Sequence, residues 1–262
     1  MERIAGIVLD VKKHNDRNNI VTLYTRSRGR MTFVSPVGTG RSAAARYARL
    51  LPLSAIETDV NVHAGQELQR LGAVAPLAVW HDIYSNPAKQ AIALFLSEFL
   101  NRLLRESAPD ERMWDFIFNS IRLLDNMEKA TANFHLAFLI SLMPYSGIFP
   151  DTSGYEEGDS FDMRSASFEA FLPAHGDCLT GDEARAVVTL SRMTFYNARL
   201  FRLTPPQRTR ALRQILKYYS IHYPGTSQLK SLDVLTEIFS FQSSLKIKKS
   251  LKSRFDRMQL FQ

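Results

Sequence analysis

Cysteine and long apolar runs are scarce in this chain of 262 residues, and both absences restrict what it can be. The single thiol, Cys178, excludes a disulfide within the chain and a zinc site built from cysteines. The longest apolar stretch, residues 132–145, contains a histidine and a proline and is shorter than the ~18 residues that span a bilayer. The amino-terminal residues lack the pattern of a signal peptide. We therefore expect a cytoplasmic protein with no membrane partner.

Signatures of catalysis and of metal binding are also missing. The six histidines include no pair at the i, i+4 spacing of a helical metal site, and no G-x-S-x-G or H-E-x-x-H motif occurs. His135 lies in an apolar segment, where a buried, hydrogen-bonded histidine is a more ordinary interpretation than a metal ligand. The acidic residues between 151 and 159 suit a solvated loop better than a cation site. We expect no enzyme, no cofactor and no bound metal.

Positive charge is plentiful but unevenly distributed along the chain. The net charge is +7, yet residues 1–80 balance at +5, residues 81–183 at −10 and residues 184–262 at +12. Basic surfaces attract polyanions, and nucleic acid is the commonest polyanion in the cytosol. The segregation of charge therefore favours nucleic-acid binding, although many basic proteins bind no anion.

Residues 3–80 show the period of two that is typical of β-strands. Turn-forming residues separate five apolar segments, at 3–13, 19–25, 31–36, 49–60 and 67–80. In the first segment apolar residues occur on both faces, with Ile4, Gly6 and Val8 on one and Ala5, Ile7, Leu9 and Val11 on the other. Five short strands with turns between them predict a small barrel or sandwich.

From residue 86 the period changes to 3.6. Helices are predicted at 87–106, 110–127, 130–145, 181–193, 205–223 and 229–240. Asp110 is placed to cap the second helix, and the third is expected to be buried because it is apolar nearly all round. Residues 145–181 predict an irregular insertion with room for a hairpin at 160–172. The fold class is therefore α+β, with a β-barrel in residues 1–80 followed by an all-helical domain in residues 81–262.

The segment VGTGRS, residues 37–42, follows a predicted strand as a phosphate-binding loop does. It lacks the lysine and the spacing of a P-loop, and hairpin-linked strands precede it instead of the βαβ unit of a dinucleotide fold. We therefore interpret it as a flexible loop on the rim of the barrel. The loop presents Arg41, Arg46 and Arg49 beside the basic hairpin at 26–30, a surface that can follow a phosphate backbone.

Aromatic residues near this basic surface are candidates for stacking on bases. They are Tyr24, Phe33 and Tyr47. For Phe33, strand alternation makes a place in the barrel core the stronger alternative.

The last residues, 243–262, form a basic amphipathic pattern. Ile247, Leu251, Phe255 and Met258 share one helical face, flanked by six lysine and arginine side chains. Three interpretations stay open: contact with DNA, contact with a membrane surface, or a basic end whose apolar stripe packs on the core.

Several segments, taken in order, resemble the recombination mediator family RecO. In the first part they are GIVL at 6–9, Gly29-Arg30, the glycine loop with its basic run, and LLPL at 50–53. Further on they are IYSNPAKQAIALFLSEFLNRLL at 83–104, NFHLAFLISLMPYSG at 133–147 and QLKSLDVL at 228–235. The resemblance spans nearly the whole chain and depends on the order of the segments more than on any one motif.

The resemblance implies an OB-fold followed by a helical domain. It also implies binding to single- and double-stranded DNA, strand annealing, and help in loading recombinase onto DNA coated by single-strand-binding protein. The implied partners are the C-terminal tail of that protein and a ring-forming, RecR-like mediator, in a cytoplasmic, nucleoid-associated setting. Many members have a four-cysteine zinc site where this chain has only Cys178, so we expect a member without zinc. Ala132 and Asn133 stand where some members have arginines that dock the tail.

The basic clusters and the resemblance together give the expected site residues. Contacts with nucleic acid are expected at Lys12, Lys13, Arg26, Arg28, Arg30, Arg41, Arg46, Tyr47, Arg49 and Lys230. The acidic tail ends in apolar residues and a carboxylate, so its receptor needs an apolar stripe rimmed by basic groups, as helix 205–223 has. Contacts with the tail are expected at Arg208, Arg210, Leu212, Arg213, Ile215, Lys217 and Tyr219.

Two alternatives stay open. In the first, the stripe of helix 205–223 belongs to the core and its basic residues are merely solvated. In the second, the whole chain is an OB-fold adaptor for protein–protein contacts, or an RNA-associated OB-fold protein. A steep dependence of DNA affinity on salt separates a backbone-binding protein from an adaptor.

Overall fold

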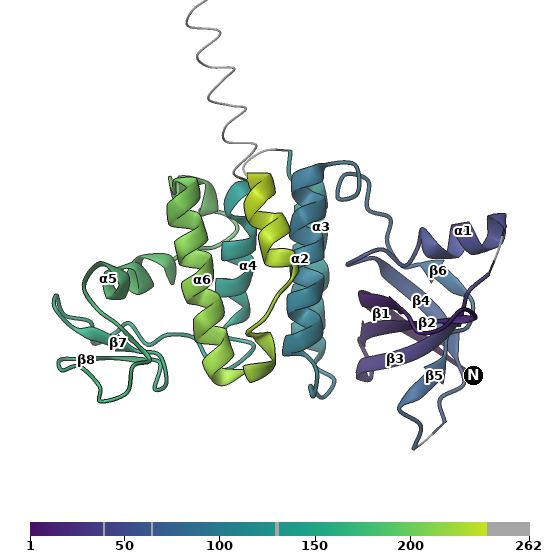
Figure 1. Ribbon diagram of the computed structural model, residues 1–262, viewed down its shortest axis with the longest axis horizontal. Coiled ribbons are helices and arrows are strands. Elements are labelled where there is room, and N and C mark those ends of the chain that lie inside the picture. Colours follow the sequence, from purple (N-terminus) through teal and green to yellow (C-terminus); the bar gives the residue numbers. More distant parts are fainter. Residues whose placement is uncertain (39, 64, 129–130, 240–262) are drawn as a thin grey trace, which may run out of the picture.

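The computed structural model describes residues 1–38, 40–63, 65–128 and 131–239. The chain forms a strand-rich barrel, a central group of helices and a small sheet on the far side of the helices (Figure 1). The barrel strands are β1 (Glu2–Lys13), β2 (Asn18–Thr25), β3 (Gly29–Pro36), β4 (Ala55–Val60), β5 (Leu68–Arg70) and β6 (Val74–Pro76). They are ordered β5-β3-β2-β1-β4-β6, and only the β3–β5 pair is parallel.

The two edge strands of this sheet are successive parts of one segment. Only residues 71–73 separate β5, which pairs with β3, from β6, which pairs with β4. At Gly72 an added Cβ would lie 2.0 Å from the carbonyl oxygen of Asp59, so the chain passes directly against β4 at this point. The segment therefore closes the sheet into the barrel of an OB-fold, with its core formed by Ile4, Val8, Val21, Leu23, Phe33, Leu50, Ile56, Val60, Leu71 and Val74.

The expected flexible loop on the rim of the barrel is instead partly helical. Helix α1 spans Arg41–Tyr47 and follows Gly40, whose φ of 86° is a conformation that favours glycine. Three successive alanines, 43–45, have the highest helix propensity of any residue type, which explains why this run folds as a helix. The prediction of a loop over these residues was wrong, because it gave the two glycines more weight than the alanines.

The helices behind the barrel begin and end close to the predicted positions. They are α2 (Pro87–Leu103), α3 (Glu111–Asn126), α4 (Phe134–Leu142), α5 (Gly181–Leu190), α6 (Pro205–His222) and a helix described over residues 231–239. Single turns of 3-10 helix lie at η1 (Thr131–Asn133), η2 (Ala198–Leu200) and η3 (Pro224–Thr226). The predicted cap of α3 is confirmed, because Asp110 Oδ1 accepts the backbone N–H of Met113 at 3.0 Å.

The helical part is not purely helical. Residues 145–181, expected to be irregular with a possible hairpin, contain a sheet of three short strands. These are β7 (Ser160–Asp162), β8 (Ser167–Glu169) and β9 (Cys178–Leu179), in the order β8-β7-β9. The hairpin is formed by β7 and β8, and the sheet packs next to α5 (Figure 1).

Helix α4 is the centre of the helical part, as its all-round apolar sequence predicts. Ser141 is the only one of its nine residues that is not buried. His135 is 1% exposed and lies among aromatic rings, at 6.3 Å from the ring of Phe95 and 5.5 Å from that of Phe239. The expectation that this histidine is buried is confirmed. Its Nδ1 has no hydrogen-bond partner among the described residues, so the expectation that the ring is hydrogen-bonded is not confirmed for this nitrogen.

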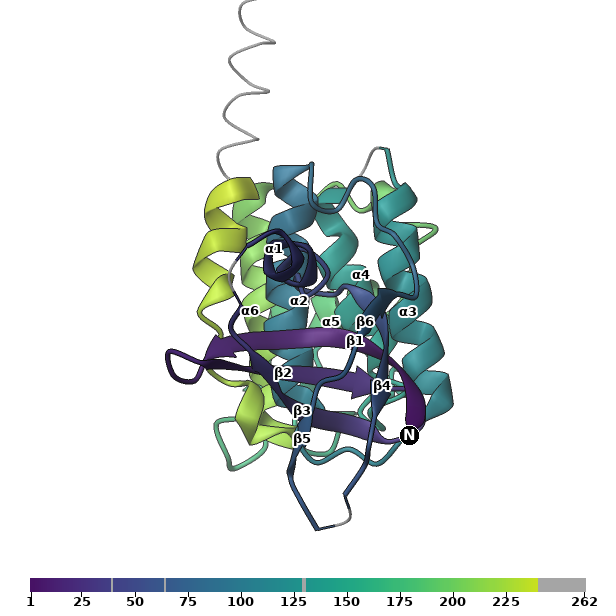
Figure 2. The same cartoon turned by 90° about the vertical axis from the view of Figure 1, so that its right-hand side faces the viewer.

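Strand β1 joins the barrel to the helices because both of its faces are apolar. Ile4 and Val8 point into the barrel, whereas Ile7 and Leu9 belong to the core shared with α2. At the β2–β3 turn, Gly29 has a φ of 65°, and a Cβ there would lie 2.7 Å from the carbonyl oxygen of Ser107. Viewed from the barrel side, the strands lie directly in front of the helices (Figure 2).

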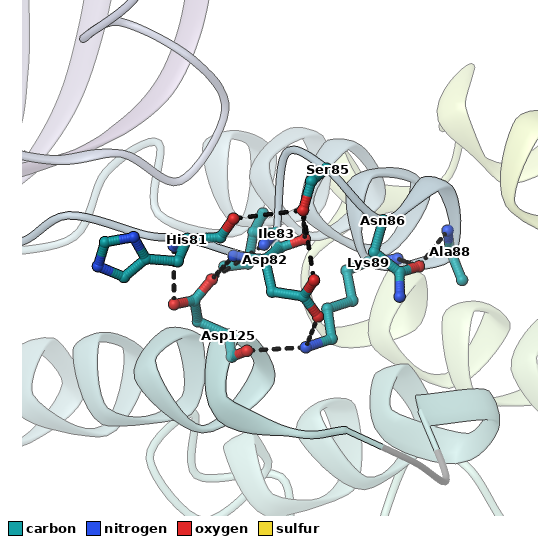
Figure 3. Close-up of polar contacts among 8 residues, drawn as sticks. All are labelled: His81, Asp82, Ile83, Ser85, Asn86, Ala88, Lys89 and Asp125. Carbon is teal, nitrogen blue, oxygen red and sulfur yellow. Dashed lines mark hydrogen bonds and ion pairs between the residues drawn. The ribbon is translucent and has the colours of Figure 1, made fainter.

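A polar cluster fixes the segment that connects the two parts (Figure 3). Asp125, near the end of α3, accepts the backbone N–H groups of His81, Asp82 and Ile83 at 3.0, 2.8 and 2.9 Å. The ammonium group of Lys89 on α2 is 1% exposed, donates to the carbonyl oxygen of Asp125 at 2.7 Å and pairs with Asp82 at 2.5 Å. The hydrogen bond from Lys89 lowers the pKa of Asp82. The connecting residues are thereby held to both α2 and α3.

Candidate nucleic-acid interface

A groove of about 770 Å³ runs along the junction between the barrel and the helices. Its barrel wall comes from β1 and β3, and its helical wall comes from α2 and residues 225–234. Five basic side chains line it: Lys12, Arg30, Arg102, Arg105 and Lys230. Two acidic side chains, Asp10 and Glu98, accompany them, so three positive charges are not balanced within the lining.

On the barrel wall a chain of hydrogen bonds orients the cations. Arg30 Nε donates to the side-chain oxygen of Asn101 on α2 at 3.2 Å, and the Asn101 amide donates to Asp10 at 3.3 Å. Asp10 also pairs with Lys12 at 2.7 Å. Burial lowers the pKa of Arg30, and the nearby charge of Arg105 acts in the same direction. A partly desolvated guanidinium interacts more strongly with an anion than a fully hydrated one does.

On the helical wall one carboxylate organises the basic groups. Glu98 accepts the backbone N–H groups of Lys230 and Ser231 at 3.1 and 2.8 Å, and the hydroxyl of Ser231 at 2.6 Å. It therefore caps the helix at residues 231–239 and fixes the place of Lys230. Burial raises the pKa of Glu98, but the hydrogen bonds from Ser231, Lys230 and Arg102 outweigh it, and the pKa lies below its usual value.

The cations of the groove differ in how far they are already paired. Lys12 and Arg102 form ion pairs with Asp10 and Glu98. Arg105 and Lys230, by contrast, form no ion pair with any residue that the structure describes. They are the two groups of the lining that are most available to an incoming phosphate.

A second basic surface, the α1 surface, consists of Arg41, Arg46, Tyr47 and Arg49. Arg41 is exposed and Arg46 is half-buried. The Tyr47 hydroxyl accepts from the Asn19 amide at 3.1 Å, and Arg49 donates to the carbonyl oxygen of Val74 at 2.6 Å. The α1 surface leads into the groove, because Leu50 and Pro52 directly after it belong to the lining.

The remaining sequence-predicted contacts lie outside the groove. Lys13, at the end of β1, pairs with Asp16 at 2.8 Å. Arg28 forms hydrogen bonds with both carboxylate oxygens of Glu2, and Arg26 lies 3.6 Å from Glu111 and 5.5 Å from the centroid of the Trp114 ring. The structure therefore brings Lys12, Arg30 and Lys230 together, whereas Arg26 and Arg28, in the β2–β3 turn next to Arg30, are occupied by acidic residues.

Two of the three aromatic candidates for base stacking were wrong. Tyr24 and Phe33 are both fully buried, and the Tyr24 hydroxyl donates to the carbonyl oxygen of Asp110 at 3.4 Å. Strand alternation places them inside the molecule, as the alternative for Phe33 anticipated. Only Tyr47 remains partly accessible.

The apolar stripe of α6 belongs to the core. Leu212, Ile215, Leu216 and Tyr219 are all buried, and the Tyr219 hydroxyl donates to the carbonyl oxygen of Leu139 at 2.8 Å. The expectation of an open apolar groove on this stripe was therefore wrong, and the alternative that it packs in the core is confirmed. The stripe appeared ambiguous in the sequence because a buried helix and a peptide-binding helix share the same periodicity.

The basic residues of α6 occupy two different places. Arg208 is half-buried and donates to the side-chain oxygen of Asn133 at 2.8 Å, at the start of α4. It thus brings a positive charge to the place where the sequence has Ala132 and Asn133 instead of arginines. On the outer side an open groove of about 540 Å³ is lined by residues that include Pro205, Pro206, Arg210, Arg213 and Lys217. Arg210 pairs with Glu183 at 2.6 Å and Lys217 with Asp177 at 3.8 Å.

Sequence reasoning missed Arg102, Arg105 and the acidic residues of the groove. Arg102 and Arg105 lie on the polar side of a helical pattern, where exposed basic residues are ordinary. Their only local signal is the i, i+4 spacing from Glu98 to Arg102, which indicates a helical ion pair and not a binding site. Their position opposite Lys12 and Arg30 makes them candidates for the site, and only the tertiary structure shows it.

Clusters of other chemistry are not found in the described part of the chain. Among those residues no group of three or more His, Cys, Asp or Glu side chains is placed to hold a metal ion. None of the described helices is long and apolar enough to cross a membrane. The basic tail predicted at 243–262 lies outside the described residues.

The fold and the groove define a class of protein: an OB-fold barrel joined to a helical bundle, with a basic groove along the junction. Two family models match the chain, "Recombination protein O N terminal" over residues 1–79 and "Recombination protein O C terminal" over residues 84–233. The chain belongs to the RecO family of DNA repair proteins, which gives it a role in recombinational repair.

Curated relatives match over nearly their full length. The chain is 37% identical over 240 residues to the DNA repair protein RecO of Phocaeicola vulgatus, covering 92% of this chain and 100% of that protein. It is also 37% identical over 240 residues to the DNA repair protein RecO of a Bacteroides fragilis strain, covering 91% and 99%. For the DNA repair protein RecO of Porphyromonas gingivalis W83 the identity is 33% over 238 residues, covering 89% and 97%.

Proposed function

We propose that this chain binds single- and double-stranded DNA in the groove between its barrel and its helices. The observation that supports the proposal is the convergence of Lys12 and Arg30 from one wall with Arg102, Arg105 and Lys230 from the other. Cations on two facing walls can contact successive phosphates of one strand, and such contacts supply most of the affinity of sequence-independent binding. In the context of recombinational repair, this binding serves strand annealing and the loading of recombinase onto DNA coated by single-strand-binding protein. The proposal requires no catalytic step.

A double variant tests the groove. Replacing Arg105 and Lys230 with glutamine removes the two exposed cations of the lining that have no ion-pair partner among the described residues, so the fold should keep its stability to within about 0.5 kcal/mol. The plot of log affinity against log salt should lose about 1.4 units of slope with single strands, because each phosphate contact contributes about 0.7. Fluorescence anisotropy with a labelled oligonucleotide at several salt concentrations measures both affinity and slope.

The matched control replaces two other basic residues of the same molecule, Arg26 and Arg28, with glutamine. These arginines are engaged by Glu2 and Glu111 outside the groove, so the slope should stay as in the unmodified protein. A third variant, Arg41→Ala with Arg46→Ala, measures what the α1 surface adds. An unchanged slope in the Arg105/Lys230 variant, or an equal loss in the control, would show that the groove is not where DNA binds.

We further propose two protein partners, the C-terminal tail of single-strand-binding protein and a RecR-like mediator. For the acidic tail, the outer groove of α6 is supported by Arg213, which is exposed, and by the apolar rings of Pro205 and Pro206. A short peptide depends on few charges, whereas DNA still has the junction groove. Arg213→Glu combined with Lys217→Glu should therefore weaken tail binding by tenfold or more and DNA binding much less.

Calorimetry with the tail peptide, beside a DNA titration of the same variant, measures the two effects. Arg210→Gln is the control, because Arg210 is already paired with Glu183 and its loss should change peptide binding little. Equal losses for peptide and DNA, or a loss for DNA alone, would move the tail site elsewhere, with the Arg208–Asn133 pair at the start of α4 as the next place to examine.

A further inference from the structure

The lining of the junction groove contains no aromatic side chain among the residues that the structure describes. Between its charged groups the surface is aliphatic, with Val11, Leu94 and Val234 among its members. Proteins that hold single strands by their bases use aromatic side chains as platforms, and each stacked base contributes substantially to affinity. This groove offers its ligand charges and aliphatic surface, but nothing on which a base can stack.

Aromatic residues elsewhere in the barrel do not change this. Tyr24 and Phe33 are enclosed in the two cores, and Trp80 is 9% exposed with its Nε1 donating to the carbonyl oxygen of Leu53. Tyr47 lies on α1, held by Asn19, and is not part of the groove lining. Within the described residues, no aromatic ring of the barrel therefore belongs to the lining of the groove.

The placement of charge favours the backbone as the bound part of the strand. The barrel wall presents Lys12 and Arg30, and the helical wall presents Arg105 and Lys230, so a phosphate chain between them has cations on both sides. Asp10 and Glu98 lie in the same groove and form ion pairs with Lys12 and Arg102. The aliphatic residues between the charges suit the sugars, which are the least polar part of the backbone.

We propose that the groove grips a single nucleic-acid strand by its sugar–phosphate backbone, with the bases facing away from the protein. This inference rests on the proposed function and deepens it. The pairing edges of the bases are then free while the strand is bound, so a complementary strand can pair with it without its release. In a duplex the backbone is also on the outside and the bases inside, so the groove can make the same backbone contacts before and after pairing. One site thereby accepts single and double strands and supports annealing.

The experiment compares two oligonucleotides of about 20 nucleotides, one of normal thymidines and one in which every position is an abasic spacer. Both carry the same phosphates, so backbone binding by the full-length protein predicts dissociation constants within about fivefold and equal salt slopes. A larger loss of affinity for the abasic strand would overturn the proposal, because a stacked base is worth about tenfold or more.

A second measurement reads base exposure directly. Permanganate attacks thymines that are not covered by a stacking partner, so bound thymines should react as fast as those of the free strand. Protection of the bound thymines would also overturn the proposal. The Arg105/Lys230 double variant separates this inference from the proposed function, because its affinity for both oligonucleotides should fall by the same factor.

Each outcome of the variant has a distinct meaning. Suppose that the variant binds both oligonucleotides less tightly, and that the unmodified protein binds the abasic strand as well as the normal one. Both the proposed function and the proposed orientation of the strand are then supported. If the variant binds the normal strand less tightly, but the unmodified protein does not bind the abasic strand, the groove binds DNA and the proposed orientation of the strand is wrong. If it changes neither, the proposed function of the groove fails, and the inference fails with it.

Discussion

Replacing Asp125 with alanine is expected to lower the free energy of unfolding by about 4 kcal/mol. Asp125 is 8% exposed, and its two carboxylate oxygens accept three backbone N–H groups, those of His81, Asp82 and Ile83. Alanine leaves all three donors without this partner, the N–H of Ile83 in a buried place and those of His81 and Asp82 in partly buried ones. A buried donor without a partner costs about 1–3 kcal/mol, so three of them add up to several.

A graded series makes this expectation specific to the hydrogen bonds. Asp125→Asn keeps Oδ1, which accepts from Asp82 and Ile83, but turns the atom facing His81 into a donor. Its cost should be about 1–2 kcal/mol, between the unmodified protein and the alanine variant. Asp115→Ala, on the exposed side of the same helix, should change stability by less than about 0.5 kcal/mol.

Urea unfolding followed by circular dichroism measures the series. The carbonyl oxygen of Asp125, which accepts from Lys89, belongs to the backbone and survives every substitution, so the buried ammonium keeps its partners. If the alanine and asparagine variants unfold at the same urea concentration as the Asp115 control, the three hydrogen bonds contribute nothing to stability. The prediction would then be wrong, and the connecting segment would be held by other contacts.

The local part of the fold follows from the sequence, because it depends on neighbours along the chain. The periodicities of two and 3.6 place the strands of the barrel and the helices, and Asp110 caps α3 as predicted. Helix α1 was missed because two local signals conflict there: Gly40 favours a loop, and the alanines 43–45 favour a helix. The curved closure of the barrel at Gly72 was not visible either, because it depends on a contact with Asp59 across the sheet.

The candidate site follows from the sequence only as a set of charges. Lys12, Arg30 and Lys230 were identified as basic, but their common groove depends on contacts between residues about 90 to 130 positions apart, such as Asp10 with Asn101 and Glu98 with Lys230. Whether a basic residue is free or paired depends on equally distant partners. Arg28 is paired with Glu2 and Arg105 has no such partner among the described residues, although both look alike in the sequence.

One buried charge can be recognised from its position in the sequence. Lys89 lies three residues before Ile92 and seven before Leu96, on the apolar stripe of α2. A lysine on the buried stripe of a helix must have a partner, because an unpaired charge in the core is very costly. A partner for Lys89 can therefore be expected from the position of the lysine on the stripe, but only the structure shows that Asp82 and the carbonyl oxygen of Asp125 supply it.

The second large effect concerns pH and has its origin in His135. The ring is 1% exposed among Phe95 and Phe239, and Nδ1 has no hydrogen-bond partner in the described structure. Burial lowers the pKa of His135 to about 3, and the nearby guanidinium of Arg208 acts in the same direction. In the unfolded chain the same group has a pKa of about 6.5. The folded state therefore holds this ring neutral where the unfolded state takes up a proton.

The sign of the effect follows from which state binds the proton. Below about pH 6.5 the unfolded chain binds one more proton than the folded protein, so stability rises with pH and is lost as pH falls towards 3. Above about pH 7 the ring is neutral in both states and contributes no pH dependence. Within the window the slope approaches about 1.4 kcal/mol per pH unit, which gives a loss of about 2 kcal/mol between pH 7 and pH 5.

The substitution His135→Leu removes the titrating group and keeps the site apolar. Between about pH 7 and pH 5 the free energy of unfolding of this variant should therefore fall by about 2 kcal/mol less than that of the unmodified protein. Urea unfolding at about pH 7, 6 and 5 measures both proteins above the range in which most carboxylates titrate. The exposed His14 is the control, and His14→Gln should give a profile parallel to that of the unmodified protein. The leucine variant has a packing cost of its own, but that cost is the same at every pH and leaves the slope unaffected. Parallel profiles for the leucine variant and the unmodified protein would show that His135 takes up its proton in the folded state, and hence that water or an acidic group reaches the ring.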